Sequence, residues 1–600
     1  MKKLLVLISF SVFFINNFYY CQSSSNPAIT AKEIQAIINY LASDKLEGRF
    51  TGSKGAGLAA EFIKKDFLSS GLLPLFNGSY YQDFPFIAGI EPAAGNSFQL
   101  FTNKKADNLK LNKDYIPAPF SGNFRIESQL VFAGYGISAQ ELNYDDYAGL
   151  DVRGKAVVIL RFNPDEGHAR SKFEKYSALR YKAKVAKEKG AAAVIFVNGY
   201  YPKDDEDKLM KLSYDGAKGI DSLCIVQVKR NIIDRLFNSE NLNLKNYQAR
   251  MDSTKKPASF IFKNSNIKIE TGLREITKYG RNVAGYIRGS DPSLSNQYIV
   301  LGAHYDHLGY GEIGSLYRGK EKKIHYGADD NASGTAGIME LAEKFSSIKT
   351  KLKRSLIFIC FAGEELGTLG SSYFVNNPPV PLQNISAMIN LDMIGRLNTD
   401  NDLIVYGLGT SSIWKDLIEK DKAGFNFNMK LKDDGYAPSD QSSFYAKNIP
   451  VLFFFTDIHS DYHRPTDIAS KINSAGEEKI LKLVDQISFQ VDTLSIKPDY
   501  ISVPRKDTGE KISFRVYVGT IPDFGSQADG YKINGVSEGS PAQKGGLKAG
   551  DVIINFGGKK ISNIYDFTYA LGDFSPGDIV DVSVLRNGEK INLKLELGVR

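Results

Sequence analysis

Cysteine is scarce in this chain of 600 residues, which holds only Cys21, Cys224 and Cys360. So few cysteines cannot build the disulfide framework of small exported domains, and the fold must therefore rest on a large hydrophobic core. The hydrophobic share of 42% is sufficient for such a core. Thiolates are also too few for a metal site, so any bound metal would need histidine and carboxylate ligands.

A strong excess of one charge is missing too. The 75 basic and 68 acidic residues leave a formal net charge of only +7. No basic block stands out along the chain, which argues against nucleic acid as a partner.

An apolar run long enough to cross a bilayer is also lacking. The N-terminal run from Leu4 to Ile15 is too short for a spanning helix and follows Lys2 and Lys3. This pattern predicts a signal peptide over residues 1–21 and no membrane span. We therefore expect an exported protein in the periplasm, outside the cell or on its outer surface. A lipid anchor at Cys21 is left open.

Hydrophobic periodicity divides the rest of the chain into three domains. Residues 27–115 and 275–495 form the two parts of a main domain, 116–270 an inserted α/β or β domain, and 505–600 a β-rich C-terminal domain. Continuous apolar runs in the main domain predict the central strands of a doubly wound, mostly parallel α/β sheet with helices on both faces. These runs are Tyr298–Ala303, Ser355–Phe361, Ser386–Leu391 and Pro450–Phe455.

Each of these four runs is followed by residues that can bind a metal. Five of the six histidines lie between His304 and His463. The carboxyl ends of the strands of an open α/β sheet meet in one crevice, so we expect these side chains to converge. Two histidines and three carboxylates could hold two zinc ions around a shared water, and a further carboxylate could take the proton. Taken alone, however, an acidic pair before a helix more often caps the helix N-terminus than binds a metal.

The candidate ligands stand in five short motifs: 303–306 (AHYD), 327–334 (GADDNASG), 364–365 (EE), 390–392 (NLD) and 462–467 (YHRPTD). These motifs resemble those of the two-zinc aminopeptidases of the bacterial leucyl-aminopeptidase type, which include glutamate carboxypeptidase-like enzymes. The resemblance implies two Zn²⁺ per chain, with His304 and Asp392 on one zinc, Glu365 and His463 on the other, and Asp329 bridging them. It also implies Glu364 as the general base, Asp306 as the residue that orients His304, and a cis peptide between Asp329 and Asp330.

The other two domains carry resemblances of their own. The insert resembles a protease-associated domain through Tyr135-Gly136 and its α/β pattern, and its lone His168 is predicted to lie at the surface. The C-terminal domain resembles a PDZ domain of the bacterial protease type through 539–542 (GSPA) and 546–553 (GLKAGDVI). PDZ domains pair an extended peptide, often a C-terminus, with a sheet edge.

Together these features predict a secreted, zinc-dependent aminopeptidase that acts on peptides with a free N-terminus. A carboxypeptidase or dipeptidase on the same metal site is the first alternative, because pocket residues in loops leave no sequence pattern. The second alternative is an inactive, peptide-binding adaptor built on the insert and the PDZ domain.

Overall fold

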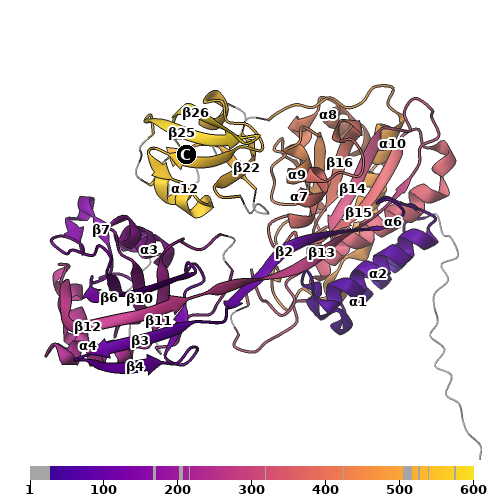
Figure 1. Cartoon of the computed structure of the whole chain (residues 1–600). Coiled ribbons are helices and arrows are strands. Elements are labelled where there is room, and N and C mark those ends of the chain that lie inside the picture. The colour runs from indigo at the N-terminus through magenta and orange to yellow at the C-terminus, as the bar shows by residue number, and fades with distance from the viewer. Residues whose placement is uncertain are drawn as a thin grey trace, which may run out of the picture.

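The computed structural model describes residues 28–599 except 166–170, 202–206, 215–216, 318, 423, 504–515, 524–527, 538, 573 and 575. The predicted signal peptide with Cys21, and His168, lie outside the described residues. Among the helices in the described part, none combines the length and apolarity that a membrane crossing requires. Three large sheets define a main domain, an insert and a C-terminal domain (Figure 1).

The main domain is built on a nine-stranded sheet whose central strands are parallel, as predicted. Its order is β1-β13-β15-β14-β16-β19-β17-β18, with β2 paired to β13. Strands β15, β14, β16 and β19 run parallel, whereas β13 and β17 pair antiparallel at the two sides. The strands are β1 (Leu73–Pro74), β2 (Tyr81–Pro92), β13 (Leu273–Ile287), β14 (Tyr298–His304), β15 (Ser355–Phe361), β16 (Ile385–Leu391), β17 (Asp402–Tyr406), β18 (Asn428–Leu431) and β19 (Val451–Phe455).

Helices cover both faces of this sheet, which is why β15 and β16 are buried at every position. One hydrophobic cluster joins the sheet to α1 (Ala31–Leu41), α2 (Lys54–Ser69), α6 (Gly334–Ser347), α8 (Trp414–Lys422) and α10 (Ser474–Thr493). The cluster on the opposite face contains Phe374 of α7 (Leu369–Asn376) and Phe444 of α9 (Gln441–Tyr445). The predicted doubly wound architecture is confirmed.

The insert is an eight-stranded mixed sheet and starts earlier in the chain than expected. Residues 97–109, expected in the main domain, form β3 and β4, and β3 pairs with β12 in the insert sheet. The partner strand lies more than 150 residues away, so no local pattern reveals this pairing. The elements are β3 (Ser97–Thr102), β4 (Lys105–Leu109), β5 (Tyr115–Pro117), β6 (Phe124–Phe132), β7 (Ser138–Ala139), β8 (Tyr144–Asp145), β9 (Ala156–Leu160), α3 (Leu179–Glu188), β10 (Ala193–Val197), β11 (Cys224–Val228), α4 (Arg230–Ser239), α5 (Leu244–Thr254) and β12 (Phe260–Thr271).

The C-terminal domain contains the predicted hairpin. Strands β25 and β26 pair in register up to Arg586 and Glu589, and the two turn residues, Asn587 and Gly588, both have positive φ, as a tight hairpin turn requires. The elements are β20 (Val516–Tyr517), β21 (Thr520–Pro522), β22 (Tyr531–Val536), α11 (Pro541–Lys544), β23 (Val552–Phe556), β24 (Lys559–Lys560), α12 (Ile564–Leu571), β25 (Ile579–Arg586), β26 (Glu589–Glu596) and β27 (Gly598–Val599).

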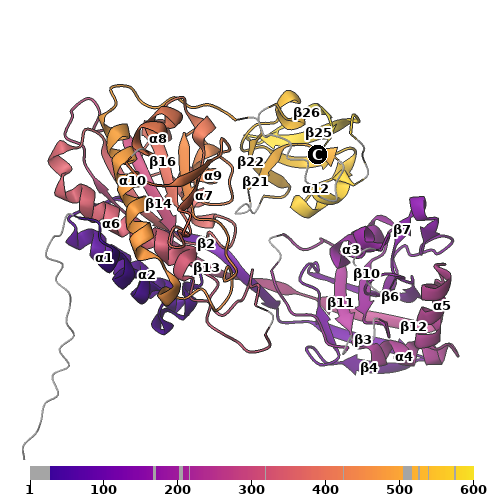
Figure 2. The same ribbon diagram turned by 180° about the vertical axis from the view of Figure 1, so that it is seen from behind.

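A long antiparallel ribbon of β2 and β13 links the main domain to the insert, and the C-terminal domain lies beside both (Figures 1 and 2). On the insert side, Lys184 of α3 forms an ion pair of 3.3 Å with Asp566 of α12. On the main-domain side, the Tyr436 hydroxyl packs against Gly535 of β22. A Cβ atom on residue 535 would lie only 2.6 Å from that hydroxyl oxygen. The C-terminal domain therefore contacts both of the other domains.

Candidate active site

The metal-binding residue types meet at the carboxyl edge of the parallel strands. His304 is the last residue of β14, and Asp392 directly follows β16. Glu364 and Glu365 come just after β15, and His463 follows β19. Parallel strands place their carboxyl ends at one edge, which brings these residues together as the sequence predicted.

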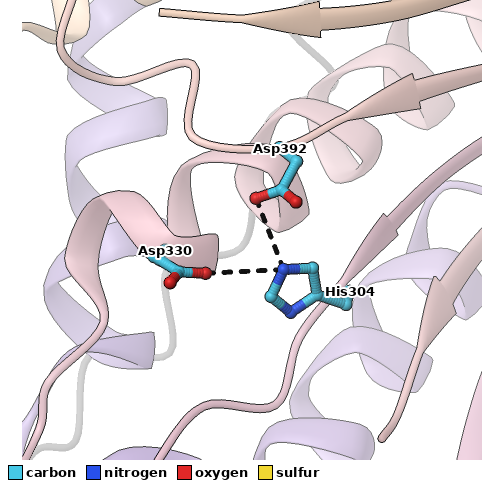
Figure 3. A group of neighbouring side chains, drawn as sticks. All are labelled: His304, Asp330 and Asp392. Carbon is cyan, nitrogen blue, oxygen red and sulfur yellow. Dashed lines mark ion pairs between the residues drawn. The ribbon is translucent and has the colours of Figure 1, made fainter. Parts of the chain in front are cut away.

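The first half of the site surrounds the His304 imidazole (Figure 3). Its Nε2 lies 3.3 Å from Asp392 Oδ1 and 3.5 Å from Asp330 Oδ1. These three residues are buried and close enough to share one metal ion. The Ser439 hydroxyl donates a hydrogen bond of 2.7 Å to Asp392 Oδ2 and so orients that carboxylate.

The second half of the site lies on the other side of Asp330. His463 Nε2 is 3.2 Å from Glu365 Oε2 and 3.3 Å from Asp330 Oδ2. One oxygen of Asp330 thus faces His304 and the other faces His463. Asp330 has the geometry of a carboxylate that bridges two metal ions.

This arrangement corrects the prediction that Asp329 bridges the two halves. The carboxylate of Asp329 points elsewhere: its Oδ1 accepts from the Gly395 N–H at 2.7 Å, and its Oδ2 lies 3.1 Å from His459 Nε2. The cis peptide bond is likewise Asp330-Asn331 rather than Asp329-Asp330. The sequence pattern does not distinguish Asp329 from Asp330, because the two residues are identical and adjacent. The backbone turn before α6 determines which of the two carboxylates faces the site.

His307 belongs to the cluster although it had no assigned role. Its Nδ1 is 2.6 Å from Glu365 Oε1 and 3.7 Å from Asp330 Oδ2, and these three residues form a second group that could hold a metal. Its buried Nε2 has no hydrogen-bond partner within the described structure. The sequence signal was the spacing of His304, at the end of β14, and His307, three residues later, which places two imidazoles near one strand end.

Asp306 contacts His304 and also joins two loops of the site. His304 Nδ1 is closer to the main-chain oxygen of Asp306, at 3.2 Å, than to its carboxylate, at 3.7 Å. The carboxylate accepts hydrogen bonds from the Thr51 hydroxyl at 2.6 Å and from the Glu364 N–H at 3.3 Å. Asp306 thus ties the loop after β14 to the loop after β15.

The concentration of buried carboxylates in the site favours the binding of cations. Burial raises the pKa of Asp330 to about 6, and the nearby Glu365 carboxylate adds to the effect. Burial also raises the pKa of Glu364, with Asp392 adding and His304 opposing. Asp392 Oδ1 is buried without a hydrogen-bond donor among the described residues. Since buried carboxylates are costly unless paired or metal-bound, this donor set fits two divalent cations.

A buried arginine fixes the backbone under this cluster. The fully buried Arg49 guanidinium donates hydrogen bonds to the main-chain oxygens of Tyr305 at 2.8 Å, Tyr326 at 2.8 Å and Gly327 at 2.9 Å. These carbonyls belong to the two segments that carry His304 and Asp330. Arg49 therefore sets the spacing between the segments.

Replacing Arg49 by methionine is expected to lower the free energy of unfolding by at least about 3 kcal/mol, because each buried carbonyl left without a donor costs about 1–3 kcal/mol. Urea unfolding followed by circular dichroism measures the change. Arg153→Met is the matched control: its side chain is 82% exposed, and its effect should stay within about 0.5 kcal/mol. Equal midpoints for the two variants would show that Arg49 has no such role.

A cavity of about 1560 Å³ leads away from the site. Its lining includes Glu365 of the site together with Leu366, Tyr310 and Tyr373. The site is therefore accessible to a ligand much larger than water.

Family comparisons agree with the three domains. Residues 282–487 match the family described as "Peptidase family M28", residues 126–232 match the PA domain, and residues 510–597 match the PDZ domain. The PA match falls within the insert, and the PDZ match covers the C-terminal domain.

Among curated proteins, the chain is 28% identical over 198 residues to leupeptin-inactivating enzyme 1 of Streptomyces exfoliatus, covering 32% of this chain and 39% of the relative. It is 28% identical over 221 residues to leucine aminopeptidase 2 of Trichophyton rubrum, covering 32% and 41%. The chain thus spans about two fifths of the length of these relatives. Among solved structures, BSAP, a zinc aminopeptidase from Bacillus subtilis, aligns at 19% identity with a TM-score of 0.45, covering 79% of this chain and 99% of that one.

Proposed function

Because residues 282–487 of this chain match peptidase family M28, we propose that it is an aminopeptidase that uses two zinc ions to remove N-terminal residues from peptides. The observation that carries the proposal is the position of Asp330, whose two oxygens face two separate groups of histidine and carboxylate ligands. The signal-like N-terminus supports the further proposal that the protein is exported.

Two groups of neighbouring side chains support the proposal of two ions. His304 and Asp392 would hold one, Glu365 and His463 the other, and Asp330 both. His307, which lies against Glu365, would either bind the second ion or orient that glutamate. Bound zinc would lower the pKa of a water molecule and polarise the carbonyl of the scissile bond.

The general base is Glu364. Its Oε2 lies 3.9 Å from His304 Nε2, so its carboxylate borders the ligands without being part of either group. We propose that the Glu364 carboxylate accepts a proton from the attacking water. It then donates this proton to the leaving amine as the C–N bond breaks. The hydrogen bond from its own N–H to Asp306 positions its backbone for this role.

Metal content and substrate hydrolysis measured on the same preparation test the proposal. We expect close to two zinc ions per chain and release of the free N-terminal residue from aminoacyl chromogenic amides. Chelation should lower that activity by at least about 10³-fold, because the metal supplies several kcal/mol of transition-state stabilisation. Restoring zinc should restore the activity.

Peptides with a blocked N-terminus are the matched control and should stay intact. Two zinc ions with cleavage of blocked peptides from the C-terminus, or of dipeptides alone, would favour a carboxypeptidase or a dipeptidase. Absence of metal from folded protein would refute the enzymatic proposal and favour a peptide-binding adaptor.

A further inference from the structure

All three domains line the cavity that contains Glu365. The β2 segment 84–89 forms one wall, and Leu212 and Ser213 of the PA domain contribute another. The PDZ domain adds Pro522 of β21 and Thr568 of α12. The metal centre and the PDZ domain therefore open onto the same space, whose volume is sufficient for an oligopeptide.

One of these PDZ residues, Pro522, belongs to a strand at the edge of a sheet. Strand β21 is the terminal strand of its sheet and pairs only with β22 in the described structure. Helix α12 packs on β22, with the rings of Phe567 and Tyr531 4.6 Å apart. An edge strand with unpaired backbone groups is the surface to which an extended peptide adds as a further strand.

The direction of β21 determines where such a peptide would emerge. A peptide paired antiparallel to β21 places its C-terminus near Gly519, which precedes the strand, and its N-terminal side near Pro522. Gly519 has a φ of +83°, typical of turns whose N–H groups can bind a carboxylate. Pro522 and the next residue, Asp523, line the cavity shared with Glu365. The N-terminal side of the peptide would thus enter the space that leads to the metal centre.

Contacts with the PA domain and the peptidase domain fix the position of the PDZ domain beside the cavity. The ion pair of Lys184 with Asp566 is largely buried, with side-chain exposures of 19% and 12%. Asp566 lies on α12 itself, so this contact fixes α12 relative to the PA domain. The close approach of Tyr436 to Gly535 fixes the other side of the PDZ domain against the peptidase domain.

We propose that the PDZ domain binds the C-terminal part of the same peptide whose N-terminus lies at the metal centre. This inference rests on the proposed aminopeptidase function. The favoured substrate is an oligopeptide with a free C-terminal carboxylate, long enough to reach from Gly519 to the metal centre. Shorter peptides use the metal centre alone. Binding at two linked points raises the effective concentration of the N-terminus at the site, so the effect appears in KM rather than in kcat.

A series of peptides of about 2 to 12 residues tests the inference. Every peptide carries the same N-terminal residues, and each is made with a C-terminal acid or a C-terminal amide. The full-length, zinc-loaded protein should show a KM roughly tenfold or more lower for the long acids than for the short ones. Amidation should remove most of this gain, while kcat changes little.

Two arginine variants locate the effect. Thr568→Arg places a long side chain on α12 at the cavity, and Asn592→Arg adds the same side chain on β26, which does not line it. Thr568→Arg should raise KM for the long acids to the value of the short ones. Asn592→Arg should leave KM unchanged, and both variants should hydrolyse aminoacyl amides like the original protein.

The outcomes separate the two proposals. A KM that depends neither on length nor on the C-terminal group overturns the PDZ inference, provided that aminoacyl amides are cleaved. A length effect that amidation and Thr568→Arg both leave intact also overturns it, because the gain then comes from the peptidase domain or the PA domain. If zinc-loaded protein cleaves no aminoacyl amide, the aminopeptidase proposal itself fails.

Discussion

Asp330→Asn is expected to lose at least one of the two proposed zinc ions and to lower kcat/KM by about 10³-fold or more, which corresponds to about 4 kcal/mol of lost stabilisation. The reason is geometric. Asp330 Oδ1 lies 3.5 Å from His304 Nε2 and Oδ2 lies 3.3 Å from His463 Nε2, so this one carboxylate serves both halves of the site. An asparagine offers only one oxygen and no negative charge. Elemental analysis of metal content, calorimetric titration with zinc and steady-state kinetics measure the loss.

Asp329→Asn is the matched control, because it is the same chemical change one residue earlier at an equally buried position. Its carboxylate accepts from Gly395 N–H and Ser333 Oγ and contacts His459, which are structural contacts around the site. We expect this variant to be less stable but to keep both metal ions. If Asp329→Asn loses metal while Asp330→Asn retains it, the bridging ligand is Asp329 and the assignment from the structure is wrong.

Glu364→Gln is expected to keep both metal ions and lower kcat by about 10²–10⁴-fold, the usual contribution of a general base. The change removes the group that accepts the proton but preserves the size of the side chain and the N–H that donates to Asp306. KM should change little, because Glu364 acts in the transition state rather than in substrate binding. Steady-state kinetics on an aminoacyl amide, with metal content measured on the same sample, provides the test.

Glu365→Gln separates this role from metal binding. Glu365 contacts His463 at 3.2 Å and His307 at 2.6 Å, so its replacement should release zinc as well as lower activity. The two adjacent glutamates should therefore differ in metal content more than in residual activity. Turnover that is unchanged in Glu364→Gln, at full zinc occupancy, would exclude Glu364 as the base.

The strands of the central sheet could be predicted from local hydrophobic patterns. The run Ser355–Phe361 predicted β15 residue for residue, and Tyr298–Ala303 predicted β14 to within one residue. Such runs are informative because a strand covered on both faces must be apolar throughout. The convergence of His304, Glu365 and Asp392 followed from the same reasoning, since parallel strands end at one edge.

Pairing between strands that are distant in the sequence could not be predicted from such local patterns. Strands β3 and β4 carry no local signal that assigns them to the insert, because their place depends on pairing with β12 far along the chain. His307 also stood in the sequence without a role, since only the fold brings the loop after β14 against Glu365.

The doubly wound main domain, the residue types of the candidate ligands and the strand ends that carry them were thus all predictable from the sequence. Hydrophobic periodicity and residue chemistry are local properties, and they suffice for these conclusions. The position of Asp330 rather than Asp329 between the two halves depends on the folded chain, because backbone hydrogen bonds from both residues to Asp467 fix the turn before α6. The shared cavity of the metal centre and the PDZ domain likewise depends on the folded chain, since it requires contacts between three domains that are distant in sequence.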